Sequence, residues 1–216
     1  MDLEDVWPLF RLRLRTPRLE LRLARDEDLG QLADAALAGI HDPAVMPFAT
    51  PWTDAEPAEQ ARGIAQHVWR QRAECTPDDW TLLFAIRHEG RAIGLQDVRG
   101  HRFPTRRTIS TGSWLAGPMH GRGLGTEMRA AVLAFAFDHL GAEVAETSAA
   151  DWNGSSQGVT RKLGYRENGF GRIETRPGRM SVDVRFRLEP SWFVRPGWTL
   201  EVEGVGDARR ELGLED

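Results

Sequence analysis

The sequence predicts an α+β fold, with a mixed, mostly antiparallel central sheet, one parallel strand pair and about four helices. Residues 80–86 and 92–98 flank Glu89-Gly90, an arrangement typical of an antiparallel hairpin. Residues 117–125 hold four glycines and one proline between a strand-like and a helix-like segment. A helix and a further strand follow this loop, and this order favours a crossover that makes two strands parallel.

The strands are recognised by alternation of apolar with polar residues, which places every second side chain on the same face. Residues 10–14 and 19–23, for example, alternate apolar and charged side chains. The predicted strands cover residues 10–14, 19–23, 80–86, 92–98, 108–116, 143–149 and 182–188. Residues 198–205 form one further candidate strand near the C-terminus.

The helices are recognised by apolar residues three or four positions apart and by residues suited to helix ends. Asp26 can cap the first helix, and Gly164 follows the last. The predicted helices cover residues 26–37, 56–74, 126–140 and 153–163. Between the first two, residues 41–52 hold three prolines and several large apolar side chains, which indicates a long ordered loop.

Composition and charge argue against several classes of function. The net charge of the 216 residues is −4, whereas nonspecific nucleic-acid binding calls for a basic balance. The longest uncharged apolar run has eight residues, too short for a membrane helix, and the acidic start lacks the apolar segment of a secretory signal. Cys75 is the only cysteine, and no two histidines have a metal-ligand spacing. We therefore expect a cytoplasmic protein that uses no metal and binds neither nucleic acid nor membrane.

The glycine-rich loop His120-Gly121-Arg122-Gly123-Leu124-Gly125-Thr126 joins a strand to a helix. Glycines lack a Cβ, so backbone N–H groups can approach an anion closely, and the following helix adds the positive end of its dipole. Residues 102–129 contain five arginines and one acid, which suits a polyanionic ligand. The absence of a following Gly-Lys-Ser/Thr disfavours a nucleotide-phosphate binder. The loop predicts a phosphate site, with a plain glycine-rich connector as the alternative.

This loop resembles motif A of the GNAT N-acyltransferase superfamily, in which Gln/Arg-x-x-Gly-x-Gly/Ala binds the pyrophosphate of coenzyme A. His120 stands here in place of Gln or Arg. Asn153-Gly154-Ser155-Ser156 and Lys162-Leu163-Gly164-Tyr165 resemble the second signature of the same family. The resemblance implies a GNAT-like sheet in which the parallel strand pair is splayed.

Two further stretches resemble particular branches of the family. Arg15-Thr16-Pro17-Arg18-Leu19 resembles the first strand of the ribosomal-protein N-terminal acetyltransferases. Trp7-Pro8-Leu9-Phe10 and Trp114-Leu115 resemble a mycobacterial-type subgroup, some members of which use succinyl-CoA. The resemblance implies one acyltransferase domain over residues 1–189, followed by a C-terminal extension over residues 190–216 that could add a strand.

The resemblance also implies a donor site. The strand at 113–116 is expected to splay from the next strand, so that backbone groups of Trp114, Leu115 and Ala116 hold the pantetheine arm and the thioester oxygen. Asn153 is expected to position the backbone and pantetheine. The expected contacts to the pyrophosphate are those of His120, Gly121, Arg122, Gly123, Leu124, Gly125 and Thr126.

Two catalytic residues are expected. By resemblance, Ser156 donates a hydrogen bond to the departing sulfur, because Thr160 stands where many relatives have tyrosine; an ordinary first-turn hydroxyl is the alternative. The motifs do not identify the general base, since Thr111 stands where relatives often have glutamate. Asp97 is the candidate base, with His101 or a chain of waters as alternatives.

The expected function is transfer of an acyl group, acetyl by default, from acyl-CoA to an amine by direct attack in a ternary complex. The acceptor could be a protein N-terminus, a lysine or a small molecule. The alternatives are a succinyl-CoA-dependent N-succinyltransferase and a non-catalytic CoA-binding or sensor protein. The C-terminal extension could supply an interface for a homo-oligomer.

Overall fold

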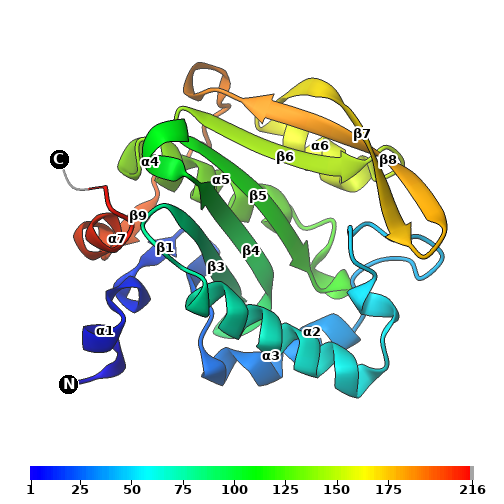
Figure 1. The fold of residues 1–216 in the computed structure, drawn as a ribbon, viewed down its shortest axis with the longest axis horizontal. Coiled ribbons are helices and arrows are strands. Elements are labelled where there is room, and N and C mark those ends of the chain that lie inside the picture. Colours follow the sequence, from blue (N-terminus) through cyan, green and yellow to red (C-terminus); the bar gives the residue numbers. More distant parts are fainter. Residues whose placement is uncertain (215–216) are drawn as a thin grey trace.

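The computed structural model describes residues 1–214, which form one nine-stranded sheet with the order β7-β8-β6-β5-β4-β3-β2-β1-β9 (Figure 1). The strands are β1 Arg13–Arg15, β2 Leu19–Leu23, β3 Asp79–His88, β4 Arg91–His101, β5 Thr108–Leu115, β6 Val144–Ala150, β7 Arg166–Arg176, β8 Arg179–Leu188 and β9 Glu201–Glu203. The helices are α1 Leu3–Val6, α2 Leu29–Leu37, α3 Pro57–Ala73, α4 Phe103–Arg106, α5 Leu124–His139, α6 Gly154–Lys162 and α7 Val205–Glu211.

The predicted α+β class is confirmed. Every neighbouring strand pair is antiparallel except β5 and β6, which are parallel and are joined through α5. The described residues contain seven α-helices rather than about four. The additional helices α1, α4 and α7 have four, four and seven residues, too few for apolar periodicity to reveal them.

Two strand predictions differ from the structure. Residues 10–14 were expected to be extended, but Pro8–Arg11 form a 3₁₀ turn and the strand begins only at Arg13. Proline at the first turn position favours such a start because its φ is already fixed. The edge strand β7 was missed, since nearly all of its residues are at least partly exposed and show no apolar alternation.

Two apolar clusters cover the two faces of the sheet. On one face, α2 and α3 pack against Leu83 and Ala85 of β3. On the other face, α5 packs against Phe84 and Ile86 of the same strand, because side chains alternate along it. Most residues of α5 are buried, and its alanines allow close approach to the sheet. The helix that follows the glycine loop is therefore held rigidly beneath β5.

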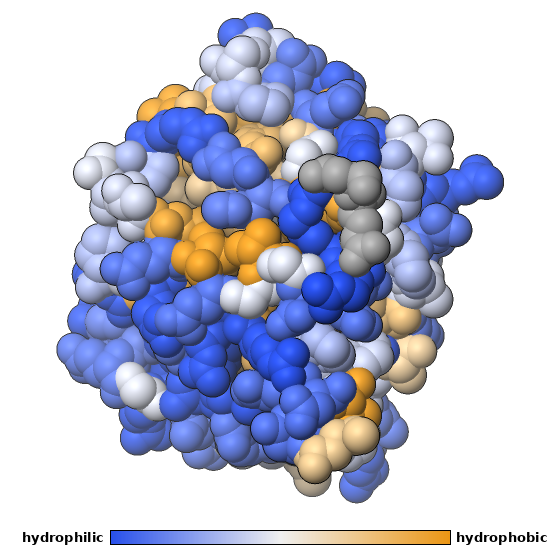
Figure 2. Space-filling view, turned by 90° about the vertical axis from the view of Figure 1, so that its left-hand side faces the viewer, coloured by the Kyte–Doolittle hydropathy of each residue, from blue (hydrophilic) through white to orange (hydrophobic). Residues whose placement is uncertain are grey.

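The C-terminal segment is part of the same sheet and core. β9 pairs antiparallel with β1, and Ala208 and Leu212 of α7 are fully buried. The guanidinium of Arg209 donates to the carbonyl oxygen of His139 at the end of α5, at 2.8 Å. The face that carries α7 is mainly hydrophilic, with apolar residues grouped near its centre (Figure 2).

Within residues 1–214 there is no helix with the length and apolar character needed to cross a membrane. The same residues contain no cluster of three His, Cys, Asp or Glu side chains that could hold one metal ion.

Candidate active site

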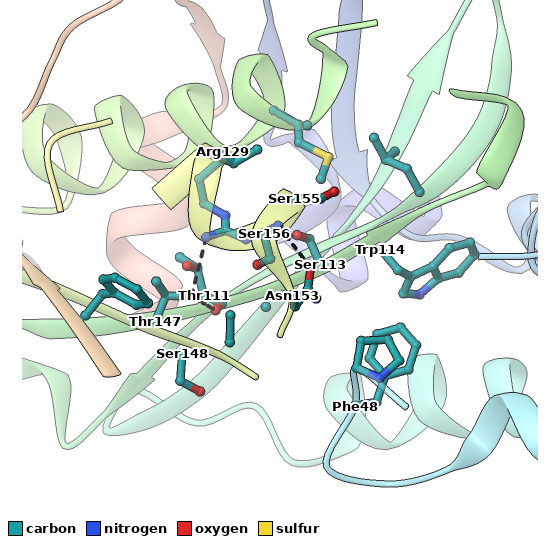
Figure 3. Close-up of a pocket in the computed structure, with 18 of the residues that line it drawn as sticks. Phe48, Thr111, Ser113, Trp114, Arg129, Thr147, Ser148, Asn153, Ser155 and Ser156 are labelled. Atoms are coloured by element: carbon teal, nitrogen blue, oxygen red, sulfur yellow. Dashed lines mark hydrogen bonds between the residues drawn. The ribbon is translucent and has the colours of Figure 1, made fainter. Parts of the chain in front are cut away.

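A cavity of about 1110 Å³ lies between β5, β6, α5, α6 and the loop over residues 41–54. Its walls include residues 110–115 of β5 and 146–149 of β6. In the close-up, side chains from β5 and β6 surround the guanidinium of Arg129, while Trp114 and Phe48 lie to one side (Figure 3). The cavity is large enough for an extended ligand and a second small group.

The cavity exists because β5 and β6 separate after a short pairing. Their parallel pairing covers only residues 108–110 and 144–146. The N–H of Ala116 donates to Ile93 O on β4 at 2.9 Å. Because N–H groups alternate in direction along a strand, those of Ser113 and Leu115 point away from β4 and into the gap. The gap therefore offers a free strand edge to an extended ligand that carries amide groups.

Two carbonyl groups on this edge are already occupied by side chains. Thr147 Oγ1 donates to Thr111 O at 3.0 Å, and His120 Nε2 lies 2.8 Å from Leu115 O. Since a carbonyl can only accept, Nε2 carries the proton in the second contact. The backbone N–H of His120 donates to Gly117 O at 2.9 Å. His120 thus fastens the end of β5, and its contact with a pyrophosphate stays a prediction.

The loop before α5 has the geometry of an anion site. Gly121 and Gly123 have φ angles of 72° and 79°, in the left-handed region that favours glycine. α5 begins at Leu124, so the N–H groups of its first turn have no acceptor within the helix. Gly121, Gly123, Gly125 and Thr126 line the cavity. These donors and the helix dipole together suit a phosphate group at the cavity mouth.

Three of the expected donor-site residues, Leu124, Ala116 and Arg122, have few or no groups that face the cavity. The side chain of Leu124 is buried in the core, which leaves only its N–H for a ligand. Both backbone groups of Ala116 are used inside the protein, since its carbonyl accepts from Met119 N–H at 2.9 Å. Arg122 is exposed and does not line the cavity. Their contacts with a ligand stay predictions.

A buried carboxylate anchors the loop to the β1–β2 turn. Glu127, in the first turn of α5, accepts from Thr16 Oγ1 at 2.6 Å and from Arg18 Nε at 2.6 Å. Arg18 Nη1 in turn donates to the carbonyl of Arg122 at 2.9 Å. A charge-assisted network of this kind is stronger than neutral hydrogen bonds, so the loop is preformed.

Asn153 and Ser156 meet at the start of α6. Asn153 Oδ1 accepts from the N–H of Ser156 at 3.1 Å and thereby caps the helix. The hydroxyl of Ser156 lines the cavity and has no hydrogen-bond partner among residues 1–214. Thr160 is fully buried, and its hydroxyl donates to Ser156 O at 2.9 Å. Ser156 is therefore free to act on a ligand, as is the neighbouring Ser155, which also lines the cavity.

Asp97, the candidate base, is buried at the β4–β5 pairing and does not line the cavity. Its Oδ1 accepts from the N–H of Gly112 at 2.6 Å, and its Oδ2 accepts from Arg99 at 2.5 Å. The two carboxylate oxygens thus bind the backbone of β5 and the guanidinium of Arg99. This geometry disfavours Asp97 as a base, and that role stays a prediction. His101 lies at the far end of β4, beside Asp79.

A buried cation lies under the separated strands. Arg129 is only 5% exposed, and its guanidinium contacts the neutral oxygens of Ser113 at 3.0 Å, Thr147 at 3.4 Å and Gln96 at 3.4 Å. Within residues 1–214 it makes no salt bridge to a carboxylate. A buried charge without a counter-ion is costly, so its retention suggests a role in ligand binding.

Two unpartnered hydroxyls accompany this cation. Thr111 Oγ1 and Tyr165 Oη are buried and have no hydrogen-bond partner within the described part of the chain. Burial raises the pKa of the Tyr165 hydroxyl, so this group stays protonated at neutral pH. A buried polar group without a partner is rare in proteins and calls for an explanation. Thr111 and Arg129 line the cavity, whereas Tyr165 lies in the core and does not line it.

Comparison with known families identifies the fold and its chemistry. The acetyltransferase (GNAT) domain matches residues 18–166 of the chain, more than half of its length. The chain belongs to this family. The protein is accordingly a CoA-dependent N-acyltransferase, which accounts for the free strand edge next to an anion loop.

Solved structures with this fold agree with the assignment. RimJ of Mycobacterium smegmatis, in complex with CoA-disulfide, is 18% identical, covers 92% of this chain and 93% of its own, and has a TM-score of 0.68. RimL, a ribosomal L7/L12 α-N-protein acetyltransferase in complex with coenzyme A, is 15% identical, with coverages of 81% and 95% and a TM-score of 0.65. A GCN5-related N-acetyltransferase from Brucella melitensis is 21% identical, with coverages of 84% and 80% and a TM-score of 0.63.

In this GNAT domain, the wall opposite α5 is formed by the loop over residues 41–54. Its aromatic rings form a ladder in which His41 packs on Phe48 at 5.6 Å and Phe48 on Trp52 at 5.4 Å. Trp52 then packs on Trp114 of β5 at 5.8 Å, measured between ring centroids. The ladder fixes this loop against the sheet, as the prolines of the sequence indicated.

The β7–β8 hairpin closes over the same loop. Arg176, at the end of β7, binds both carboxylate oxygens of Asp54, at 2.6 and 2.8 Å, and donates to Pro43 O at 2.8 Å. The guanidinium lowers the pKa of Asp54, so this pair stays ionised at neutral pH. The bridge therefore ties the hairpin to the loop that forms one wall of the GNAT site.

Arg129 was not among the residues predicted for the site, although the sequence carries a signal for it. Residues 128–137 of the GNAT helix are apolar except for this one arginine. A single charge inside a helix that is apolar all round must be buried with it, and such a charge usually has a function.

Proposed function

We propose that the protein transfers an acyl group, acetyl by default, from acyl-CoA to an amine by direct attack in a ternary complex. The observation that carries the proposal is the free edge of β5, which runs directly into the anion loop before α5. Pantetheine would pair with the N–H groups of Ser113 and Leu115, and the pyrophosphate would lie on residues 121–126. The N–H of Leu115 would meet the thioester oxygen as negative charge develops on it.

The acceptor would approach from the face of the sheet opposite α5, beside Trp114 and the loop over residues 41–54. We propose a protein N-terminus as the first acceptor class, since one relative of the same fold acts on the α-amino group of a ribosomal protein. A lysine side chain and a small-molecule amine are the other classes. The cytoplasm remains the predicted compartment, and an interface for a homo-oligomer stays a prediction.

The proposal is tested by release of free CoA thiol. Purified protein is incubated with acetyl-, propionyl- or succinyl-CoA and a panel of N-terminal peptides, lysine peptides and small amines. Amine-dependent thiol release is expected with at least one pair. Binding of CoA without thiol release for any pair would instead favour the non-catalytic sensor.

A succinyl donor is a second candidate, and Arg129 is the observation that favours it. The terminal carboxylate of a succinyl group needs a cation or several donors once it leaves water. The guanidinium of Arg129 lies at the base of the gap between β5 and β6, where an acyl chain longer than acetyl would extend. Its planar fork suits a carboxylate.

Replacing Ser156 by alanine is expected to lower kcat by about 10- to 100-fold with little change in CoA affinity, because one weakly acidic partner of the sulfur is lost. Steady-state kinetics and calorimetry with CoA measure the two effects. Ser155→Ala is the matched control, since Ser155 is the adjacent hydroxyl and also lines the cavity. A loss of affinity with unchanged kcat would reassign Ser156 to binding alone.

A further inference from the structure

Trp114 lies next to the backbone group that is proposed to bind the thioester oxygen. The preceding side chain on β5, Ser113, contacts Arg129 of α5 at 3.0 Å. Since successive side chains of a strand point to opposite faces, Trp114 points to the face opposite α5. α5 and its apolar contacts fill the other face. An amine therefore reaches a thioester at the N–H of Leu115 from the side of the Trp114 ring.

A second aromatic ring faces the cavity beside Trp114. Phe48, from the loop over residues 41–54, and Trp114 are both partly buried, and both line the cavity (Figure 3). Trp52, which does not line the cavity, packs on each of them, with ring centroids 5.4 Å from Phe48 and 5.8 Å from Trp114. Trp52 therefore supports the two rings that a ligand would contact.

The rest of this wall adds no charge and no free polar group from a side chain. Its other cavity-lining residues are Ile40, Pro47, Ala49 and the ring of His41. Both nitrogens of that ring are occupied, since Nδ1 lies 2.8 Å from Asp42 O and Nε2 lies 2.8 Å from Thr53 Oγ1. The side chains of this wall therefore offer a ligand mainly apolar contacts.

The charged residues that line the cavity on this face lie at other positions of the sheet. Arg99 of β4 and Glu146 of β6 are both level with residue 110 of β5, four residues before Trp114. Four strand residues span about 13 Å. Asp183 and Arg185 belong to β8, the second strand from β5, and two strand spacings amount to about 10 Å. None of these charged residues is therefore adjacent to Trp114 in the sheet.

We infer that Phe48 and Trp114 form a pocket for the side chain next to the reacting amine, and that the acceptor is a peptide whose first residue is apolar. The inference rests on the proposed acyl transfer. The first side chain of a peptide branches from the carbon that carries the reacting nitrogen, so it lies beside Trp114 when that nitrogen reaches the thioester. An apolar side chain is stabilised by burial against the two rings, whereas a charged one would lose water without gaining a partner.

The test compares peptides that differ only in their first residue, which is leucine, glycine, aspartate or arginine. In the wild type, kcat/KM for the leucine peptide is expected to exceed the values for the two charged peptides by about 100-fold. Phe48→Ala should lower kcat/KM for the leucine peptide by about 30-fold, because the pocket loses one wall. The glycine peptide has no side chain to lose these contacts, so its value should stay within about threefold of the wild type. Phe48→Leu, which keeps the wall apolar, should retain most of the preference.

Trp152→Ala is the matched control. Trp152 is another aromatic residue that lines the same cavity, but it lies between β6 and α6 and is 43% exposed. Its removal should leave the ratio of the leucine to the glycine peptide unchanged. Calorimetry with CoA on each variant should show an unchanged donor affinity for Phe48→Ala.

Three outcomes overturn the pocket. These are equal wild-type rates with the leucine and aspartate peptides, equal losses with the leucine and glycine peptides in Phe48→Ala, and a change of their ratio in Trp152→Ala as large as that in Phe48→Ala. If the wild type releases no thiol with any donor and amine, the proposed function fails, and calorimetry of the same peptides on the CoA-bound protein tests the pocket separately. Tighter binding of the leucine peptide than of the aspartate peptide would then support the pocket, and equal binding would overturn it.

Discussion

Gly125→Glu is expected to abolish binding of coenzyme A, raising its Kd by about three orders of magnitude. A Cβ at this position would meet only Val159 Cγ2, at 3.9 Å, so the new side chain enters the cavity without a clash. Its carboxylate would lie against the pyrophosphate, where like charges about 4 Å apart repel by about 4 kcal/mol near a protein surface. Calorimetry with CoA on the folded variant measures the loss.

Gly125→Gln is the matched control, because it has the same size without the charge, and its loss should stay below about tenfold. Gly123→Asp is a less clean test of the same idea. Gly123 has a φ of 79°, so any side chain there adds backbone strain to the charge effect. If Gly125→Glu bound CoA as well as the wild type does, the loop could not be the pyrophosphate site.

The fold was predictable where the sequence pattern is set by burial. The strands from Asp79 to Leu115 and the helix from Leu124 to His139 follow their apolar residues closely, because these elements form the core. The short helices and β7 escaped prediction, since exposed residues are not constrained by packing against a core. The start of the chain differed because Pro8 favours a turn over a strand.

The site was predictable as a set of motifs but not as a set of contacts. The Arg15–Leu19 stretch and the glycine loop were each recognised, yet only the structure shows that Arg18 and Glu127 join them. The same limit applies to Asp97, which sequence spacing could not distinguish from a cavity residue. Its burial and its two hydrogen bonds depend on strand register, which single-sequence patterns do not fix.

Arg129→Met is expected to lower kcat/KM for succinyl-CoA by several hundredfold while changing the value for acetyl-CoA by less than tenfold. The acetyl group has no charge for the guanidinium to bind, whereas a succinyl carboxylate would lose its only buried cation. Donor competition at a fixed amine concentration, with propionyl-CoA as the uncharged longer donor, measures the difference. If the wild type prefers propionyl-CoA to succinyl-CoA, acetyl-CoA remains the proposed acyl donor.

The stability of Arg129→Met distinguishes a role of Arg129 in ligand binding from a purely structural role. Methionine would remove a buried cation that has no carboxylate partner, while Gln96 Oε1 would lose its contact at 3.4 Å. These effects oppose each other, so the free energy of unfolding should stay within about 2 kcal/mol of the wild type. Arg129→Lys keeps the charge but loses the planar fork, so it should recover only part of the succinyl rate. Equal losses with both donors, together with a much lower stability, would instead make Arg129 a structural residue.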